Sequence, residues 1–271
     1  MQRKGVTAMK QIVASALAAI AALAINWGTA GAVTIPASEL VHEPTKKVGT
    51  GLKGEYYNIR AGSRITTNSQ ADFIISYTDP TATFVAKLID YPNGGDNTMG
   101  DTKTLAEFLG GNATGLSGSG STTLDYSLFH FFGYINILDS FDVTVGNSTI
   151  DVKFALGSDD GSRLMIGGKT VVNNEGDHGF VFKNGTASFV EAGVYPIDLI
   201  FYENGGSTGI ELFSSIPGGP NSGAPAGMGT YGIVPTSVLH QVIPAPEPST
   251  MALLGMGFLG VGIAARRRKK H

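Results

Sequence analysis

Hydrophobic and polar side chains alternate in the middle of the chain with the two-residue period of a half-buried β-strand. In residues 150–156 every second side chain is hydrophobic, and similar short segments recur between residues 51 and 202. Turn-forming pairs such as Gly-Asn, Gly-Gly and Ala-Gly separate these segments. Many short strands with turns between them predict an all-β antiparallel sandwich or barrel. The expected strands cover residues 52–59, 73–77, 83–86, 128–137, 140–145, 149–156, 163–166, 170–172, 179–182, 187–190 and 194–202.

One short helix is expected among these strands, at residues 101–109. Asp101 or Thr102 can cap its start, hydrophobic side chains form a stripe along it, and a Gly-Gly pair ends it. Residues 112–123 are rich in Gly, Ser and Thr, and we expect them to form a surface loop.

The N-terminal 32 residues are expected to be a secretory signal peptide. Three basic residues precede an uncharged apolar run at 12–25, and Ala30, Gly31 and Ala32 fit a cleavage site of the small-x-small type. A first transmembrane helix is the alternative, which the shortness of the apolar run disfavours. The interpretation implies export by the Sec machinery.

The C-terminal end has a pattern of three parts. Pro246, Glu247 and Pro248 precede an uncharged run at 249–265, and five basic residues follow that run. The 17 residues of the run can just cross a thin bilayer as a transmembrane helix, which would leave the basic cluster in the cytoplasm. This order resembles a PEP-CTERM sorting signal, and the resemblance implies processing of the tail by a membrane exosortase. A plain membrane tail anchor is the alternative.

These patterns divide the chain into five parts. We expect a signal peptide at 1–32, a lead-in segment at 33–50, a β-domain at 51–217, a linker at 218–245 with one short returning strand, and a sorting and anchor segment at 246–271.

The charge of the chain changes once both ends are set aside. The whole chain has 19 basic and 22 acidic residues, but eight of the basic ones lie in the signal peptide and the tail. Residues 33–248 therefore carry 11 basic and 22 acidic groups, a net charge of −11. Such a surface argues against nucleic acid as a partner and is compatible with binding cations. The chain has no cysteine, so its core must be stable without disulfide bonds.

Two adjacent carboxylates interrupt the alternating pattern after residue 156. Asp159 and Asp160 lie in a Ser-Asp-Asp-Gly stretch between two expected strands, so the loop that holds them is fixed at both ends. Asp and Gly also favour ordinary tight turns, which is the alternative interpretation. The spacing is not that of an EF-hand, which needs alternating ligands and a distal glutamate.

Five segments occur in the same order as the landmarks of a known domain. These segments are 51–57, 132–135, 154–166, 176–178 and 192–197. They resemble the domain first described in anthrax protective antigen (the PA14 domain), and the resemblance covers residues 51–217. It implies an antiparallel, lectin-like β-sandwich, from which the long insertion at 91–123 departs.

The resemblance also implies a ligand set. Lectins of this family bind Ca²⁺ through the aspartate pair, joined by a cis peptide, and through an asparagine on a facing loop, and the metal then binds sugar hydroxyls. Ca²⁺ prefers six to eight oxygen ligands, which suits this arrangement. By resemblance, the metal ligands here are Asp159, Asp160, Asn204 and a carbonyl of the Gly205-Gly206 pair, assigned to Gly206, and the sugar contacts are Ser207 and Thr208.

Together these patterns predict an exported, non-enzymatic protein of the cell envelope or extracellular matrix that binds polysaccharide or another glycan with the help of Ca²⁺. A structural surface or biofilm-matrix protein without a ligand is the first alternative. A glycan hydrolase is the second, and the chain lacks a separate catalytic domain to support it.

Overall fold

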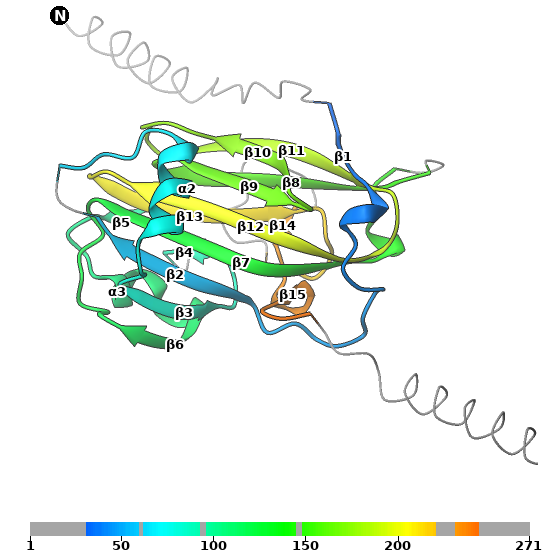
Figure 1. Cartoon of the computed structure of the whole chain (residues 1–271), viewed down its shortest axis with the longest axis horizontal. Helices are drawn as coiled ribbons and strands as arrows, with labels where there is room; N and C mark the ends of the chain where they lie inside the picture. The colour runs from blue at the N-terminus through cyan, green and yellow to red at the C-terminus, as the bar shows by residue number, and fades with distance from the viewer. Residues whose placement is uncertain (1–30, 60–61, 93–95, 145–147, 221–230, 244–271) are drawn as a thin grey trace, which may run out of the picture.

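The computed structural model describes residues 31–59, 62–92, 96–144, 148–220 and 231–243. In this part of the chain two β-sheets face each other and enclose a hydrophobic core, which confirms the predicted β-sandwich (Figure 1). The sorting segment and all but the last two residues of the expected signal peptide lie outside the described residues. Among the helices that are described, none is long and apolar enough to cross a membrane.

The first sheet is built around β8, which lies between β11 and β13. All its pairings are antiparallel except that of β1 with β11. The strands are β1 (Val33–Ile35), β4 (Asp90–Tyr91), β5 (Met99–Gly100), β8 (Ile150–Asp159), β11 (Val181–Phe189), β13 (Ser207–Ser214) and β14 (Gly232–Ile233).

The second sheet is antiparallel throughout and is built around the long pair β7 and β12. Its strand order is β10-β9-β12-β7-β2-β3-β6, and β15 also pairs with β7. The strands are β2 (Leu52–Asn58), β3 (Ala82–Ala86), β6 (Ala113–Gly118), β7 (Ser127–Ile137), β9 (Ser162–Ile166), β10 (Lys169–Asn174), β12 (Gly193–Glu203) and β15 (Leu239–His240).

Aromatic side chains from several elements fill the core. Phe129 and Phe131 of β7 lie against Phe201 of β12, Tyr91 of β4 and Phe108 of the helix α3 (Leu105–Leu109), with neighbouring ring centroids 5.2 to 6.4 Å apart. Each fully buried phenylalanine stabilises the fold by roughly 1.5–3 kcal/mol. This packing fixes β12, whose last residues reach the candidate site.

The helix α2 (Asn68–Tyr77) replaces the strand predicted at 73–77, so that prediction is wrong. Its start is stabilised by a capping box, in which Thr67 and Gln70 exchange side-chain and backbone hydrogen bonds. Ala71, with Ile74 and Ile75 beside it, packs on the outer face of the second sheet. The apolar run thus has a helical period, because Ala71, Ile74 and Ile75 share one face.

The other differences from the expected elements are local. The predicted helix at 101–109 begins only at Leu105, capped by Thr104 rather than by Asp101 or Thr102, and the expected loop at 112–123 contains β6. No strand forms in the described part of 140–145, where a 3₁₀ turn spans Asp139–Phe141. The strands expected at 179–182 and 187–190 are one continuous strand, β11.

Three further short 3₁₀ turns occur in the described residues. They span Ala37–Glu39, Gly110–Asn112 and Thr236–Val238. The lead-in segment contributes β1 to the first sheet, while the expected linker contributes β14 and β15, one to each sheet, instead of one returning strand. Strand β13, which the sequence pattern did not predict, separates β8 from β14.

Candidate metal and ligand site

Several loops meet at one end of the sandwich, on the left in Figure 1. They are the β8–β9 turn at 159–161, the β10–β11 loop at 175–180, the β12–β13 hairpin loop at 204–206 and the segment 62–67 before α2. Hydrogen bonds join these loops to one another. Each loop begins or ends at a strand or helix of the packed sandwich, so the core fixes their relative positions.

The aspartate pair lies at the centre of this loop cluster. Asp159 is the last residue of β8, the peptide bond to Asp160 is cis, and the two residues are only 9% and 7% exposed. The Asp160 carboxylate accepts hydrogen bonds from the backbone amides of His178 (2.9 Å, to Oδ1) and Asn204 (3.0 Å, to Oδ2). Asp160 therefore ties the β8–β9 turn to two other loops.

Burial makes the charge on this pair unfavourable. It raises the pKa of Asp159 to about 6, and the charge of Asp160 adds to the effect. Burial also raises the pKa of Asp160, against the opposing effect of the two amides that it accepts. Two adjacent carboxylates withdrawn from water favour either a proton or a cation nearby.

A third carboxyl group, on Glu203, lies near the aspartate pair. Glu203 is fully buried at the end of β12; its Oε1 accepts the Gly205 amide (2.5 Å), and its Oε2 makes no hydrogen bond. Burial, helped by the charges of Asp160 and Asp159 and opposed by the Gly205 amide, raises its pKa to about 8. Sequence reasoning did not place Glu203 in the ligand set, because it precedes the Asn-Gly-Gly turn to which the resemblance pointed.

Asn204 is brought next to Asp160, but its side chain holds a different part of the site. Its Oδ1 accepts the Ile65 amide (2.8 Å), and its Nδ2 donates to the Ile65 carbonyl (2.9 Å) and to Asp177 Oδ1 (2.5 Å). Asp177 is also paired with Arg64. The Asn204 oxygen keeps one lone pair, since a carbonyl oxygen has two.

The remaining predicted residues lie on the far side of the hairpin loop. The Gly206 carbonyl accepts a hydrogen bond from the Asp101 amide (2.9 Å), and the Gly206 amide donates one to Asp101 Oδ2 (2.7 Å). Ser207 is exposed and pairs with Gly100 of β5. Thr208 is fully buried, so the expectation that its side chain touches a sugar is wrong in this conformation.

Carboxylates alone do not form a closed metal site here. Among the described residues, no three His, Cys, Asp or Glu side chains converge as a metal-binding group. A cation at the aspartate pair would need oxygens from amides, backbone carbonyls or a ligand to complete its shell. Ca²⁺ accepts such a mixed, all-oxygen set, whereas zinc prefers nitrogen and sulfur ligands.

Tyr202 helps to hold the β8–β9 turn in place. Its amide donates to the Gly161 carbonyl (2.9 Å), and its hydroxyl accepts the Gly176 amide (2.8 Å). A Cβ atom at Gly161 would lie 2.2 Å from the Tyr202 ring. The glycine in the Ser-Asp-Asp-Gly stretch is therefore required by this close approach.

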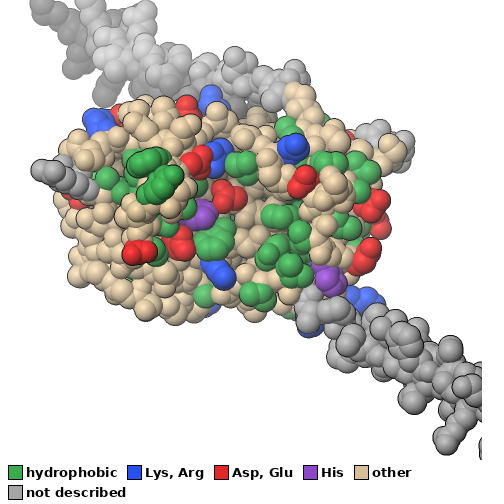
Figure 2. Space-filling model, in the orientation of Figure 1, with side chains coloured by type: hydrophobic (Ala, Val, Ile, Leu, Met, Phe, Trp, Pro, Cys, Tyr) green, Lys and Arg blue, Asp and Glu red, His purple; other side chains and the backbone are tan. Residues whose placement is uncertain are grey.

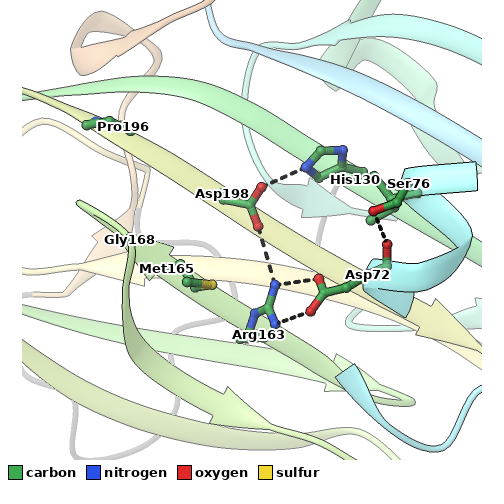
Figure 3. Close-up of a pocket in the computed structure, with 9 residues that line it drawn as sticks. Asp72, Ser76, His130, Arg163, Met165, Gly168, Pro196 and Asp198 are labelled. Atoms are coloured by element: carbon green, nitrogen blue, oxygen red, sulfur yellow. Dashed lines mark hydrogen bonds and ion pairs between the residues drawn. The ribbon is translucent and has the colours of Figure 1, made fainter. Parts of the chain in front are cut away.

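A separate polar cluster fixes α2 on the second sheet (Figure 3). Arg163 of β9 donates two hydrogen bonds of 2.8 Å to Asp72 of α2 and lies 3.7 Å from Asp198, which in turn bonds His130 at 2.7 Å. Burial lowers the pKa of His130, but Asp198 and Glu55 outweigh it and raise the pKa overall. Asp72, His130, Arg163 and Asp198 line a hollow of about 460 Å³, and sequence reasoning missed them because their partners are distant in the chain.

Comparisons with known proteins agree with this architecture. The PA14 domain of the antifreeze protein MpAFP matches with a TM-score of 0.57 and 21% identity, over 74% of this chain and 96% of that one. The PA14 sugar-binding domain from an RTX adhesin matches with a TM-score of 0.53 and 21% identity, over 71% of this chain and 99% of that one. The β-domain thus has the PA14 fold, as its sequence landmarks predicted. No curated protein matches the chain.

The predicted PEP-CTERM sorting signal is confirmed by a separate match. Residues 244–269 match the PEP-CTERM protein-sorting motif, which includes Pro246, Glu247 and Pro248. The motif indicates export and sorting to the cell envelope or surface. Its residues lie outside the part of the chain that the structure describes.

Proposed function

We propose that this protein is an exosortase-sorted surface protein whose β-domain binds carbohydrate through a Ca²⁺ ion at the aspartate pair. The observation that carries the proposal is the buried pair Asp159 and Asp160, held by backbone amides at the meeting point of several loops. The sugar binding named for the RTX adhesin domain of the same fold supports it. The sorting motif supports a location where such a ligand is available.

The donor atoms of the site suit Ca²⁺. Asp159 and Asp160 offer carboxylate oxygens, and Asn204 offers the free lone pair of Oδ1. A backbone carbonyl of the Gly205-Gly206 pair remains a proposed further ligand. When bound, the ion would neutralise the charge that burial makes unfavourable and would offer open positions to a pair of sugar hydroxyls.

The tail has a separate role in this proposal. We place cleavage by an exosortase at the segment that begins with Pro246, Glu247 and Pro248, after export has brought the β-domain across the inner membrane. The apolar run at 249–265 would hold the protein in the membrane until that step.

Retention on polysaccharide tests the binding proposal. The secreted protein is passed over columns of immobilised bacterial exopolysaccharide, mannan, galactan and dextran, once with millimolar Ca²⁺ and once with chelator. We expect retention that chelator abolishes, and that Asp159→Asn also abolishes. Asp139→Asn makes the same chemical change at an exposed position on the opposite end of the sandwich and should leave retention unchanged.

Asp159 is a better position for this test than Asp160. The Asp160 carboxylate accepts two loop amides, so replacing it disturbs the loops whether or not a cation binds. Retention that is equal with Ca²⁺ and with chelator would contradict the proposal. Absence of retention on all columns would favour a structural surface protein instead, and release of cleaved sugar would favour a hydrolase.

A further inference from the structure

We propose that the carbohydrate is a chain rather than a single sugar, and that it extends from the aspartate pair along α2 to an aromatic platform made of Phe73 and Tyr77. The inference rests on the proposed function, because it assigns a second contact region to the same ligand. Three observations carry it: an amphipathic hollow beside α2, an exposed aromatic pair at its edge, and a bonded connection to the loops of the candidate site.

The hollow lies between the segment before α2 and the helix itself, and measures about 350 Å³. Its lining combines four hydrophobic side chains with three uncharged polar ones, and its one charged side chain, that of Arg64, is paired with Asp177. A sugar ring has apolar C–H faces and a polar rim of hydroxyls, so a mixed lining of this kind suits it. The residues that matter for the argument are Ile59, Arg64, Ile65, Gln70, Phe73 and Ile74.

Figure 2 shows hydrophobic side chains gathered on the surface over α2, and the exposed large hydrophobic side chains of this helix are those of Phe73 and Tyr77. Phe73 and Tyr77 are four residues apart, their ring centroids are 4.7 Å apart, and they are 65% and 77% exposed. Among the large hydrophobic side chains that are exposed in the described residues, only these two are aromatic. The inner face of the same helix already packs on the sheet, so the fold itself does not use these two rings.

Hydrogen bonds link the wall of the hollow to the candidate site. Ile65, which lines it, donates and accepts the two backbone hydrogen bonds that hold the Asn204 side chain. Arg64, also in the lining, pairs with Asp177, which accepts a hydrogen bond from Asn204. The backbone amide of Asn204 donates to Asp160, so the wall of the hollow and the aspartate pair belong to one hydrogen-bonded network.

Charge and size favour a saccharide over the other occupants of an aromatic surface. Asp72 and Asp79 lie near the platform in sequence, and residues 33–248 carry a net charge of −11, which opposes an anionic membrane. Two aromatic side chains offer about 150–250 Å² each, well below the roughly 800 Å² that each partner buries in a stable protein complex. A neutral sugar chain needs neither positive charge nor a large area.

Affinity measured against saccharide length tests the proposal. Calorimetry in millimolar Ca²⁺ compares mannose, galactose, glucose and N-acetylglucosamine with their tri- and tetrasaccharides. We expect the wild-type protein to bind the longer saccharides more tightly. In the double variant Phe73→Ala/Tyr77→Ala this gain should fall about tenfold, while monosaccharide binding stays unchanged. Alanine is the better helix former, so α2 should be retained.

Val48→Ala is the control, because it truncates another hydrophobic side chain that is 75% exposed. Equal binding of the long saccharides by the double variant and the wild type would overturn the platform. Saccharide binding that survives Asp159→Asn and chelator, but not the double variant, would overturn the Ca²⁺ proposal and support the platform. No saccharide binding by the wild type, with binding to phosphatidylethanolamine–phosphatidylglycerol vesicles that the double variant loses, would overturn both.

Discussion

Glu203 provides a direct test of the electrostatics of the site. Its carboxyl is fully buried beside the aspartate pair and has one oxygen without a hydrogen bond. The perturbation is Glu203→Gln, which keeps the shape and the oxygen that accepts the Gly205 amide but removes the titration. We expect this variant to be more stable than the wild type at pH 7.5 when no Ca²⁺ is present.

The sign of the effect follows from the direction of the pKa shift. Burial raises the pKa of Glu203 from its usual 4.5 to about 8, so the folded protein holds the proton more tightly than the unfolded chain does. The contribution of Glu203 to stability is therefore fully present below pH 4.5 and is lost as the pH rises to about 8. Between pH 5 and pH 7.5 the loss amounts to about 3 kcal/mol.

Glu211 offers a matched control for this experiment. It is also buried, its pKa is also raised to about 8, and it also has an oxygen without a hydrogen bond. Its charged neighbour, however, is Asp90, opposite to it on β4, and not the aspartate pair. Glu211→Gln should thus reduce the pH dependence of stability to a similar extent, without changing how much Ca²⁺ stabilises the protein.

The assay is urea unfolding at pH 5 and pH 7.5, with chelator and with millimolar Ca²⁺. With chelator, the free energy of unfolding of each variant should fall by about 3 kcal/mol less than that of the wild type between pH 5 and pH 7.5. With Ca²⁺, only Glu203→Gln should gain less stability than the wild type does. Equal pH dependence in Glu203→Gln and in the wild type, or a variant less stable at pH 7.5, would refute this reasoning.

Three further predictions concern the supports of the site and the tail. Gly161→Ala should destabilise the protein by about 1–3 kcal/mol, since its Cβ meets the buried Tyr202 ring, whereas Gly179→Ala, where a Cβ meets nothing within 4 Å, should not; thermal unfolding compares the two. Arg163→Met should cost about 2 kcal/mol by urea unfolding and increase hydrogen exchange in α2, because Asp72 loses two charged hydrogen bonds; unchanged exchange would contradict this. In a host with an exosortase, mass spectrometry of the surface form should find residues 249–271 removed, and an intact basic terminus would contradict the proposed cleavage.

The strands that were predicted correctly are those with a local signal. β2, β7, β9 and β12 carry alternating or continuous apolar positions, which depend only on neighbouring residues. The helix α2 was missed because its Phe-Ile-Ile run is rich in residues that favour strands, while the capping box at Thr67 and Gln70 decides its start. β13 was missed because its first residues, Ser207 and Thr208, were interpreted as a ligand-binding loop.

The residues of the candidate site were likewise predicted only where their signal in the sequence was local. The aspartate pair was visible in the sequence because its two members are adjacent and lie between strands. Three features could not be predicted, because each depends on which segments become neighbours in the fold. They are the position of Glu203, the hydrogen bonds between Ile65 and Asn204, and the ion pair of Arg163 with Asp72. Sequence alone gives no register, and register decides which buried carboxyl groups face each other.

Calorimetric titration with Ca²⁺ at pH 7.5 tests the central claim most directly. Extracellular Ca²⁺ modules bind with dissociation constants on the order of 10⁻⁴–10⁻³ M, and a hundredfold excess over such a constant stabilises the fold by about 2.7 kcal/mol. We predict saturable binding of one ion and a higher melting temperature, both lost in Asp159→Asn and both retained in Asp139→Asn. No heat of binding and no shift in melting temperature in the unmutated protein would contradict the account and leave residues 158–161 as an ordinary turn.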